Sequence, residues 1–192
     1  MGRAQFDQTD FLVAAGGLIA ERGPQAVTVD SVAERIGAPK GSFYYRFASR
    51  DALLGELWLK TVLAYQEGFV VAIEAGDGLR AALHTPAWAR QNLDDARLLM
   101  LYSRHDFVQG DWPAALKKGV ADQAERFLGC LRRFARDAFG RAGPPQIRRA
   151  TFVLAEVPVA AVKLHLQRRE PPPPLVDELI SKTYHAIVGG AD

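Results

Sequence analysis

Residues 28–47, TVDSVAERIGAPKGSFYYRF, contain two short helical patterns joined by a single glycine turn. Thr28 precedes the first pattern, where its hydroxyl can accept hydrogen bonds from the free amides of a helix start. Gly37 ends that pattern at the position where a left-handed residue costs least. The residues between them place apolar side chains at helical spacing: Val29, Val32, Ala33 and Ile36. The stretch therefore predicts two short helices with a tight corner between them.

The second pattern predicts a helix over about residues 39–46. Pro39 is tolerated in its first turn because the amide that proline lacks would have no partner there. Phe43 and Phe47, four residues apart, predict the buried face. The other side chains are predicted to face outward and are polar, aromatic or basic: Lys40, Ser42, Tyr44, Tyr45 and Arg46. Such a face suits the DNA major groove, although this pattern alone leaves open an ordinary surface helix in a bundle.

The flanking sequence decides between these two alternatives. Residues 11–23 predict an amphipathic helix that stops at Gly23 and Pro24, and Ser49 predicts the cap of a longer helix. Three short helices followed by a long one resemble the tetracycline-repressor (TetR) family of bacterial transcription regulators. The resemblance covers about the first 60 residues and rests on these matches: Ala14, Ala15, the AERG at 20–23, Thr28, the VA at 32–33, Gly37, Lys40, Gly41, Tyr44, Phe47 and the SRDAL at 49–53.

The resemblance implies a DNA-binding role for named residues. The first residues of the recognition helix would face base edges, and the later ones would contact phosphates and neighbouring bases. An arginine at the start of the long helix and the threonine cap would contact phosphates. The DNA-binding residues implied in this way are Thr28, Lys40, Gly41, Ser42, Tyr44, Tyr45, Arg46 and Arg50.

Two positions depart from the family pattern. Pro39 stands where a serine is usual, and Asp30 lies on a face that some members direct toward DNA. Because a carboxylate repels phosphate, we expect Asp30 to cap a helix, to pair with a cation or to accept from a cytosine amine. Net charge adds little, because the whole chain carries only +2. Basic residues inside the expected contact surface with DNA, such as Lys40, are more informative than the net charge of the chain.

Composition indicates a globular chain that works in the cytoplasm. Hydrophobic residues make up 48% of it, and no segment has the build of a signal peptide. The most apolar stretch, residues 151–166, is expected to be too short and, with Glu156 and Lys163, too polar to span a bilayer, so no membrane partner is expected. The single cysteine, Cys130, excludes an internal disulfide and is expected to be a small buried apolar group.

Helical periodicity continues almost to the end of the chain, and no alternating strand pattern occurs, so the predicted class is all-α with about nine helices. After the short N-terminal helices, the predicted helices span residues 49–75, 79–92 with Pro86 limiting it, 94–106, 113–139, 151–166 and 175–188. We expect a helix-turn-helix DNA-binding domain at 5–50 and a ligand-binding and dimerisation domain at 51–192, with dimer helices within 150–190.

The last two predicted helices indicate a homodimer. The helix over 151–166 is apolar nearly all round, and the helix over 175–188 has a continuous apolar stripe, so both need cover. In the TetR family such a pair forms a four-helix interface with a second subunit. Two recognition helices spaced by one groove repeat, about 34 Å, would then bind a palindromic operator. The expected interface residues are Phe152, Val159, Val162, Leu166, Leu175, Leu179, Ile180, Thr183, Tyr184 and Ile187.

The resemblance also implies that the middle helices enclose a pocket for a small-molecule effector. The candidate lining residues are Trp58, Tyr65, Trp88, Met100, Tyr102, His105, Phe127, Phe152 and Glu156, and plain core packing is the alternative for each. Glu156 interrupts an apolar helix, and a buried carboxylate needs a partner, for which Arg104 and His105 are candidates. These aromatic residues favour a lipophilic or aromatic effector.

Nothing in the sequence indicates an enzyme, a metal site or a cofactor. The histidines His84, His105, His165 and His185 lack carboxylate partners at helical metal-site spacing, and no glycine-rich phosphate loop follows a strand. The leading interpretation is a ligand-responsive regulator, most commonly a repressor in this family, with activation left open. The alternative is a helical small-molecule-binding protein without specific DNA binding.

Overall fold

The computed structural model describes residues 6–102 and 112–190, and this part of the chain is all-α, as predicted. It contains nine helices when the continuous helix Pro144–Gln167 counts as one, a number that also matches the prediction. The elements are α1 (Gln8–Arg22), a 3-10 turn (Pro24–Ala26), α2 (Val29–Ile36), α3 (Lys40–Tyr44), α4 (Arg50–Glu74), α5 (Gly78–Gln91), α6 (Leu93–Leu101), α8 (Ala114–Phe139), α9 (Pro144–Thr151), a π turn (Phe152–Glu156), α10 (Val157–Gln167) and α11 (Pro174–Val188).

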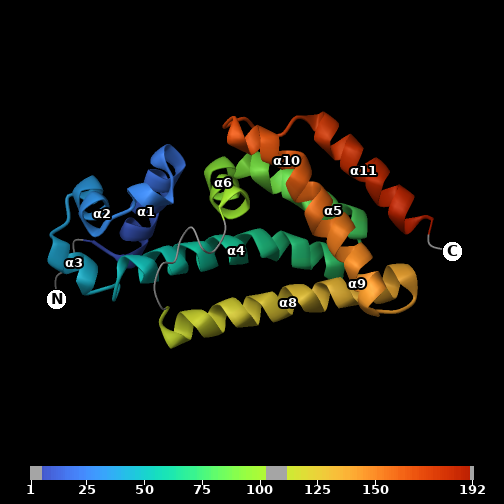
Figure 1. Ribbon diagram of the computed structural model, residues 1–192, viewed down its shortest axis with the longest axis horizontal. Helices are drawn as coiled ribbons and strands as arrows, with labels where there is room; N and C mark the ends of the chain where they lie inside the picture. The colour runs from blue at the N-terminus through green and yellow to red at the C-terminus, as the bar shows by residue number, and fades with distance from the viewer. Residues whose placement is uncertain (1–5, 103–111, 191–192) are drawn as a thin grey trace.

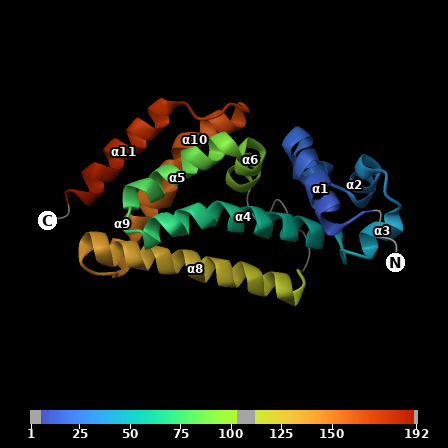
Figure 2. The ribbon, with the colours of Figure 1, turned by 180° about the vertical axis from the view of Figure 1, so that it is seen from behind.

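The long helix α4 runs through the middle of an elongated molecule (Figure 1). Helices α1, α2 and α3 gather at one end of α4, near the N-terminus, and the C-terminus lies toward the opposite end. Helix α8 lies along one side of α4, whereas α5, α6 and α10 lie on the other side and α11 is outermost (Figure 2). The N-terminal helices therefore reach the rest of the molecule through α4 and α6, both of which contact α1.

Local sequence signals set the helix boundaries around the corner between α2 and α3. The Thr28 hydroxyl accepts from the Ser31 amide at 3.0 Å, and the Ser31 hydroxyl accepts from the Thr28 amide at 2.8 Å. Gly37 ends α2 at φ 67°, in the left-handed region that glycine adopts without a Cβ penalty. The Ser49 hydroxyl accepts from the Ala52 amide at 3.1 Å and caps α4. These three signals confirm the predicted caps and turn.

Helix α4 belongs to two hydrophobic cores. Its first half contributes Leu53, Leu54 and Leu57 to the core of the N-terminal helices, and α6 adds Leu98 to the same core. Its second half contributes residues such as Phe69 to the larger core formed with α5, α8, α10 and α11. The two cores meet along one continuous helix. The division into domains at 5–50 and 51–192 stays a prediction.

The predicted limit of a helix at Pro86 is wrong. Helix α5 runs from Gly78 to Gln91 straight through Pro86, which does not limit it. A proline inside a helix costs about 3 kcal/mol, because it removes a hydrogen bond and crowds the preceding turn. Pro86 is itself buried, as are Trp88 and Ala89 after it, and the packing of this face offsets the cost.

The apolar helix near the C-terminus is longer than the predicted 151–166. It begins at Pro144 and continues through the π turn to Gln167, so its 24 residues are long and apolar enough to cross a membrane by length and composition alone. This corrects the expectation that the segment is too short and too polar. Buried core helices pass the same test, and Val153, Leu154 and Val162 of this helix lie in the chain's own core. Length and composition are therefore weak evidence for a membrane span here.

A methyl group added at Gly55 should destabilise the packing of α8 against α4. A Cβ at this position would lie 2.8 Å from the Trp112 ring and closer still to Leu116, and both side chains are buried. We expect Gly55→Ala to lower the free energy of unfolding by about 1–3 kcal/mol, as overpacked cores do. Chemical denaturation measures the change.

Gly129→Ala in α8 is the matched control, because a Cβ there would meet nothing within 4 Å. Its expected effect is a gain of about 0.5–1 kcal/mol from the better helix propensity of alanine. Equal effects of the two substitutions would contradict the close packing at Gly55.

Candidate nucleic-acid interface

Three phenylalanines fix which side of α3 faces solvent. Phe43 and Phe47 are fully buried, as predicted, and they pack with Phe11 of α1 at ring-centroid distances of 5.9 and 6.1 Å. Tilted and edge-to-face arrangements of this kind suit the charge distribution of aromatic rings. Because this cluster holds the apolar side of α3 against α1, the remaining side chains of α3 must face outward.

The outward side of α3 exposes two tyrosines. Tyr44 is 61% exposed and Tyr45 is 87% exposed, although large aromatic side chains are usually buried. Lys40 and Gly41 are exposed beside them, and Ser42 is half-buried. Helix α3 ends at Tyr44, two residues before the predicted limit of 46, so Tyr45 lies in the following turn. The structure thus exposes four of the eight predicted DNA-binding residues together, at α3 and the turn after it: Lys40, Gly41, Tyr44 and Tyr45.

Asp30 forms an ion pair with Lys40, which confirms one of its three expected roles. An Asp30 carboxylate oxygen lies 2.7 Å from Lys40 Nζ, so the pair joins the first turn of α2 to the first turn of α3. The hydrogen bond from Lys40 to Asp30 raises the pKa of the lysine. The principal cation of the predicted base-contacting face therefore has an acidic partner on the same surface.

Two of the predicted DNA-binding arginines bind backbone carbonyls of their own chain. Arg46 donates to Ser42 O at 2.8 Å and to Phe6 O, and its guanidinium lies 5.6 Å from the centre of the Phe11 ring. Arg50 donates to Val27 O at 2.5 Å and to Pro24 O at 2.8 Å.

Both arginines therefore have a structural role in this conformation, and their phosphate contacts stay predictions. Thr28 is similar, since its exposed side chain takes part in the cap of α2.

The predicted effector-binding residues do not form one group. Tyr65 and Trp88 pack against each other in the larger core, with ring centroids 5.3 Å apart, and Phe127 packs on Phe69 at 5.1 Å. The remaining ones are dispersed: Met100 is partly buried against the larger core, Trp58 and Tyr102 pack against the N-terminal core, Phe152 and Glu156 are exposed, and His105 lies outside the described residues.

Glu156 is not a buried carboxylate. It is exposed and accepts a hydrogen bond from Arg148 Nη1 at 2.8 Å, two helical turns earlier on the same continuous helix. The expected partners Arg104 and His105 lie outside the described residues. Solvent and this arginine satisfy the carboxylate, so its place in an apolar stretch carries no requirement for a ligand.

A cluster of buried polar side chains around α4, whose hydrogen bonds were not predicted from the sequence, joins α4 to α5 on one side and to α8 on the other. The Tyr65 hydroxyl is 2.8 Å from the Thr85 hydroxyl, and Gln66 Nε2 donates to Gln123 Oε1 at 2.7 Å. The Gln66 Oε1 atom is buried without a hydrogen-bond partner. His84 contacts the Tyr65 carbonyl at 2.6 Å, and burial lowers the pKa of its imidazole.

Single polar residues inside an amphipathic helical pattern are the only sequence signal for this cluster. Among residues 6–102 and 112–190, no group of three or more histidine, cysteine, aspartate or glutamate side chains can hold a metal ion. Cys130 is a free, buried thiol, as expected.

The predicted dimer residues divide into three sets. Three of them are buried in the chain's own core and are not exposed to a partner: Val162, Leu166 and Ile180. Phe152, Leu175 and Leu179 are large apolar side chains exposed to solvent. The others are half-buried: Val159, Thr183, Tyr184 and Ile187.

Sequence reasoning missed Leu164, another exposed apolar side chain of α10. Leu164 lies one helical turn after Ala160, which is also exposed. This four-residue spacing of two apolar residues was the sequence signal for an apolar surface there.

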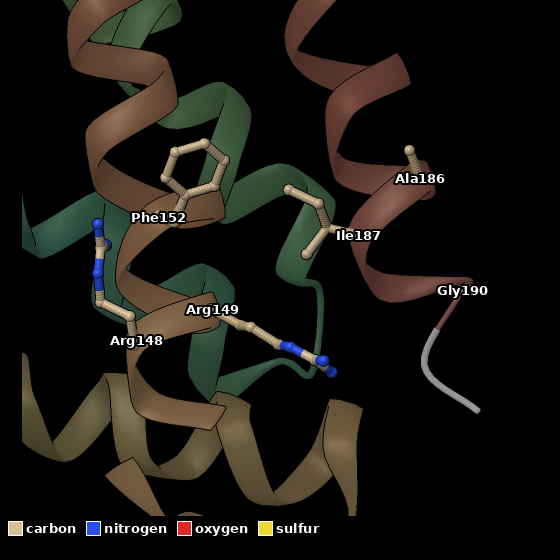
Figure 3. A pocket seen from close by; sticks show the side chains of 6 residues that line it. All are labelled: Arg148, Arg149, Phe152, Ala186, Ile187 and Gly190. Atoms are coloured by element: carbon tan, nitrogen blue, oxygen red, sulfur yellow. The ribbon is translucent and has the colours of Figure 1, made fainter. Parts of the chain in front are cut away.

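Phe152 and Ile187 also line an open groove between α9 and α11 (Figure 3). Their side chains extend toward each other between the two helices, and Arg149 extends across one end of the groove. Arg148, also counted among the lining residues, pairs with Glu156. The groove therefore combines an apolar surface with positive charge on the exposed side of the C-terminal helices.

Replacing Arg50 should weaken the fold itself. Its guanidinium joins the start of α4 to the segment between α1 and α2, is mostly buried and also pairs with Asp51. We expect Arg50→Gln to lower the free energy of unfolding by about 1–3 kcal/mol, since hydrogen bonds from a charged group are lost. Lys40→Gln, which removes an exposed lysine, should change it by less than about 1 kcal/mol. A loss of DNA affinity without loss of stability in Arg50→Gln would contradict the structural role.

Residues 11–57 match the sequence profile of a family described as bacterial regulatory proteins, tetR family. A comparison with curated proteins finds no match. Among solved structures, a tetR family transcription regulator from Shewanella sp. PV-4 has a TM-score of 0.68 at 17% identity, covering 96% of this chain and 97% of that one.

Two further structures share the fold over nearly their whole length. The transcriptional regulator FadR from Bacillus subtilis, in complex with stearoyl-CoA, has a TM-score of 0.67 at 14% identity and covers 96% of this chain and 99% of its own. The ketosteroid transcriptional regulator KstR2 of Mycobacterium tuberculosis has a TM-score of 0.57 at 17% identity, covering 98% and 96%. Residues 11–57 of this chain thus match the tetR family of bacterial regulatory proteins, and the described helices have the fold of TetR-family transcription regulators.

Proposed function

We propose that this protein is a ligand-responsive transcription regulator that binds a palindromic DNA operator as a homodimer. The observation that carries the proposal is the exposure of Lys40 and Tyr44 on the second helix of a helix-turn-helix, and of Tyr45 directly after it, while the apolar side of that helix is fully buried. Tyrosine and lysine side chains on a helix of this kind contact phosphates and base edges in the major groove. Repression is the commonest mode of the family and is the mode we propose.

The exposed apolar side chains of the C-terminal helices support the dimer. Leu164 of α10 and Leu175 and Leu179 of α11 are all large and exposed in the single chain, and Phe152 lies on the same continuous helix as Leu164. Apolar surface of this kind is stabilised by burial against a partner. A second copy with the same surface would form a symmetric four-helix contact and would present two recognition helices to successive major grooves.

A lipophilic effector is proposed to bind between α4, α5 and α8. Two buried polar pairs of α4, one with α5 and one with α8, support this position, since small-molecule sites combine apolar walls with a few oriented polar groups. The buried Gln66 Oε1 atom has no hydrogen-bond partner, and the hydroxyl of the preceding residue, Tyr65, is also buried. FadR binds stearoyl-CoA and KstR2 is a ketosteroid regulator, so two proteins with this fold are associated with lipophilic molecules. We propose that effector binding releases the operator.

Selection of genomic DNA fragments by the purified, effector-free protein tests operator binding. We expect enrichment of a palindromic sequence, and Tyr44→Ala should weaken binding to it by about 5- to 100-fold, as the loss of a specific contact does. Thermal unfolding should be unchanged, because Tyr44 is exposed. A folded dimer that enriches no sequence would overturn the proposal and favour a helical ligand-binding protein without specific DNA binding.

A charged pair of substitutions on α11 should dissociate the dimer. Leu175→Glu with Leu179→Glu places two carboxylates on the exposed apolar surface, and burying them against a partner would cost several kcal/mol. We expect the mass measured by light scattering to fall from that of a dimer to that of a monomer. Val13→Glu is the control, since Val13 is an equally exposed apolar residue of α1 and should leave the mass unchanged. A dimeric double variant would show that α11 does not form the interface.

A further inference from the structure

The Asp30–Lys40 ion pair lies on the surface proposed to enter the major groove. Asp30 is the second residue of α2 and Lys40 is the first residue of α3, so the pair spans the turn between the two helices. Its charged atoms are 2.7 Å apart, and the two side chains are 65% and 66% exposed. The pair is therefore available to DNA as a unit, with a donor and an acceptor side by side.

The fold places the two partners where their opposite charges meet. Asp30 lies in the first turn of α2, where the partial positive charge of the helix N-terminus favours a carboxylate. The hydrogen bond with Asp30 raises the pKa of Lys40 above its ordinary value. The ion pair as a whole carries little net charge to attract a phosphate, and the Asp30 carboxylate repels that phosphate.

We propose that the Asp30–Lys40 pair recognises one G·C base pair in each operator half-site and suppresses non-specific binding, an inference that rests on the proposed function. In the major groove, guanine presents O6 and N7 as acceptors, and cytosine presents its N4 amine as the adjacent donor. Lys40 can donate to guanine while Asp30 accepts from cytosine, so the pair does not have to dissociate. A phosphate leaves Asp30 without a donor, and a reversed C·G pair presents the amine to Lys40 in place of an acceptor. A T·A pair offers the ammonium group one acceptor beside a methyl group, where guanine offers two.

The pair therefore makes Asp30 a specificity-determining residue, although it bears the charge that DNA repels. Removing the carboxylate should have two effects. The freed lysine should bind phosphates of any sequence, and the preference for G·C at one position of each half-site should disappear.

The test compares wild-type dimer with Asp30→Ala in the same selection from random duplexes, together with titrations on a non-specific duplex at several salt concentrations. We expect Asp30→Ala to lose about 5- to 100-fold of its discrimination at one base pair per half-site. Its non-specific affinity should rise, with a dependence on salt steeper by about one unit of slope for the additional phosphate contact. The gain in non-specific affinity should vanish when Lys40→Ala is added.

Glu34→Ala is the matched control, because Glu34 is an exposed acid one helical turn after Asp30 on α2. It should leave the base preference intact. Equal effects of Glu34→Ala and Asp30→Ala would show that the loss of any negative charge on α2 is sufficient, and would overturn the inference. Asp30→Asn, which keeps the size of the side chain, should show the same rise in non-specific affinity and serves if the alanine variant unfolds.

The outcomes separate this inference from the proposed function. A wild-type protein that selects no sequence overturns both. A wild-type protein that selects a palindrome whose G·C positions are all insensitive to Asp30→Ala overturns the inference alone.

Discussion

Burial of α4 in two separate cores is the constraint on which the arrangement of the molecule depends. Leu53, Leu54 and Leu57 pack with the N-terminal helices, and Phe69 packs with the C-terminal ones. One rigid helix cannot satisfy both cores unless the two groups of helices keep a fixed spacing along it. The position of the recognition helix relative to α10 and α11 is thus set by side chains about four turns apart on α4, since a turn holds about 3.6 residues.

Contacts outside α4 strengthen this connection. Leu98 of α6 is buried in the N-terminal core, and Arg97 beside it donates to the Leu166 carbonyl near the end of α10. Arg169, in the left-handed conformation after α10, donates to the Glu21 carbonyl in the last turn of α1 at 2.8 Å. A movement of the C-terminal helices would therefore reach the N-terminal helices by two routes, which is the kind of contiguous contact that coupling between sites requires.

The buried residues of α3 determine which of its side chains are exposed. Burial of Phe43 and Phe47 leaves only one side of a five-residue helix for Lys40 and Tyr44, and both are exposed there. A surface of this kind costs little stability, since polar and aromatic side chains that remain hydrated lose little on folding. The exposed ion pair of Asp30 and Lys40 likewise contributes little to the stability of the fold, so it is available for recognition.

The sequence by itself determined the all-α class, the caps at Thr28 and Ser49 and the burial of Phe43 and Phe47, because capping and helical periodicity involve residues within a few positions of one another. Only the tertiary structure decided that α5 continues through Pro86, that Glu156 pairs with Arg148 and that Arg50 binds the carbonyls before α2. Those outcomes depend on which residues far apart in the sequence come into contact, and on whether burial offsets a local cost in free energy such as that of a proline inside a helix. The spacing of residues along one helix specifies neither.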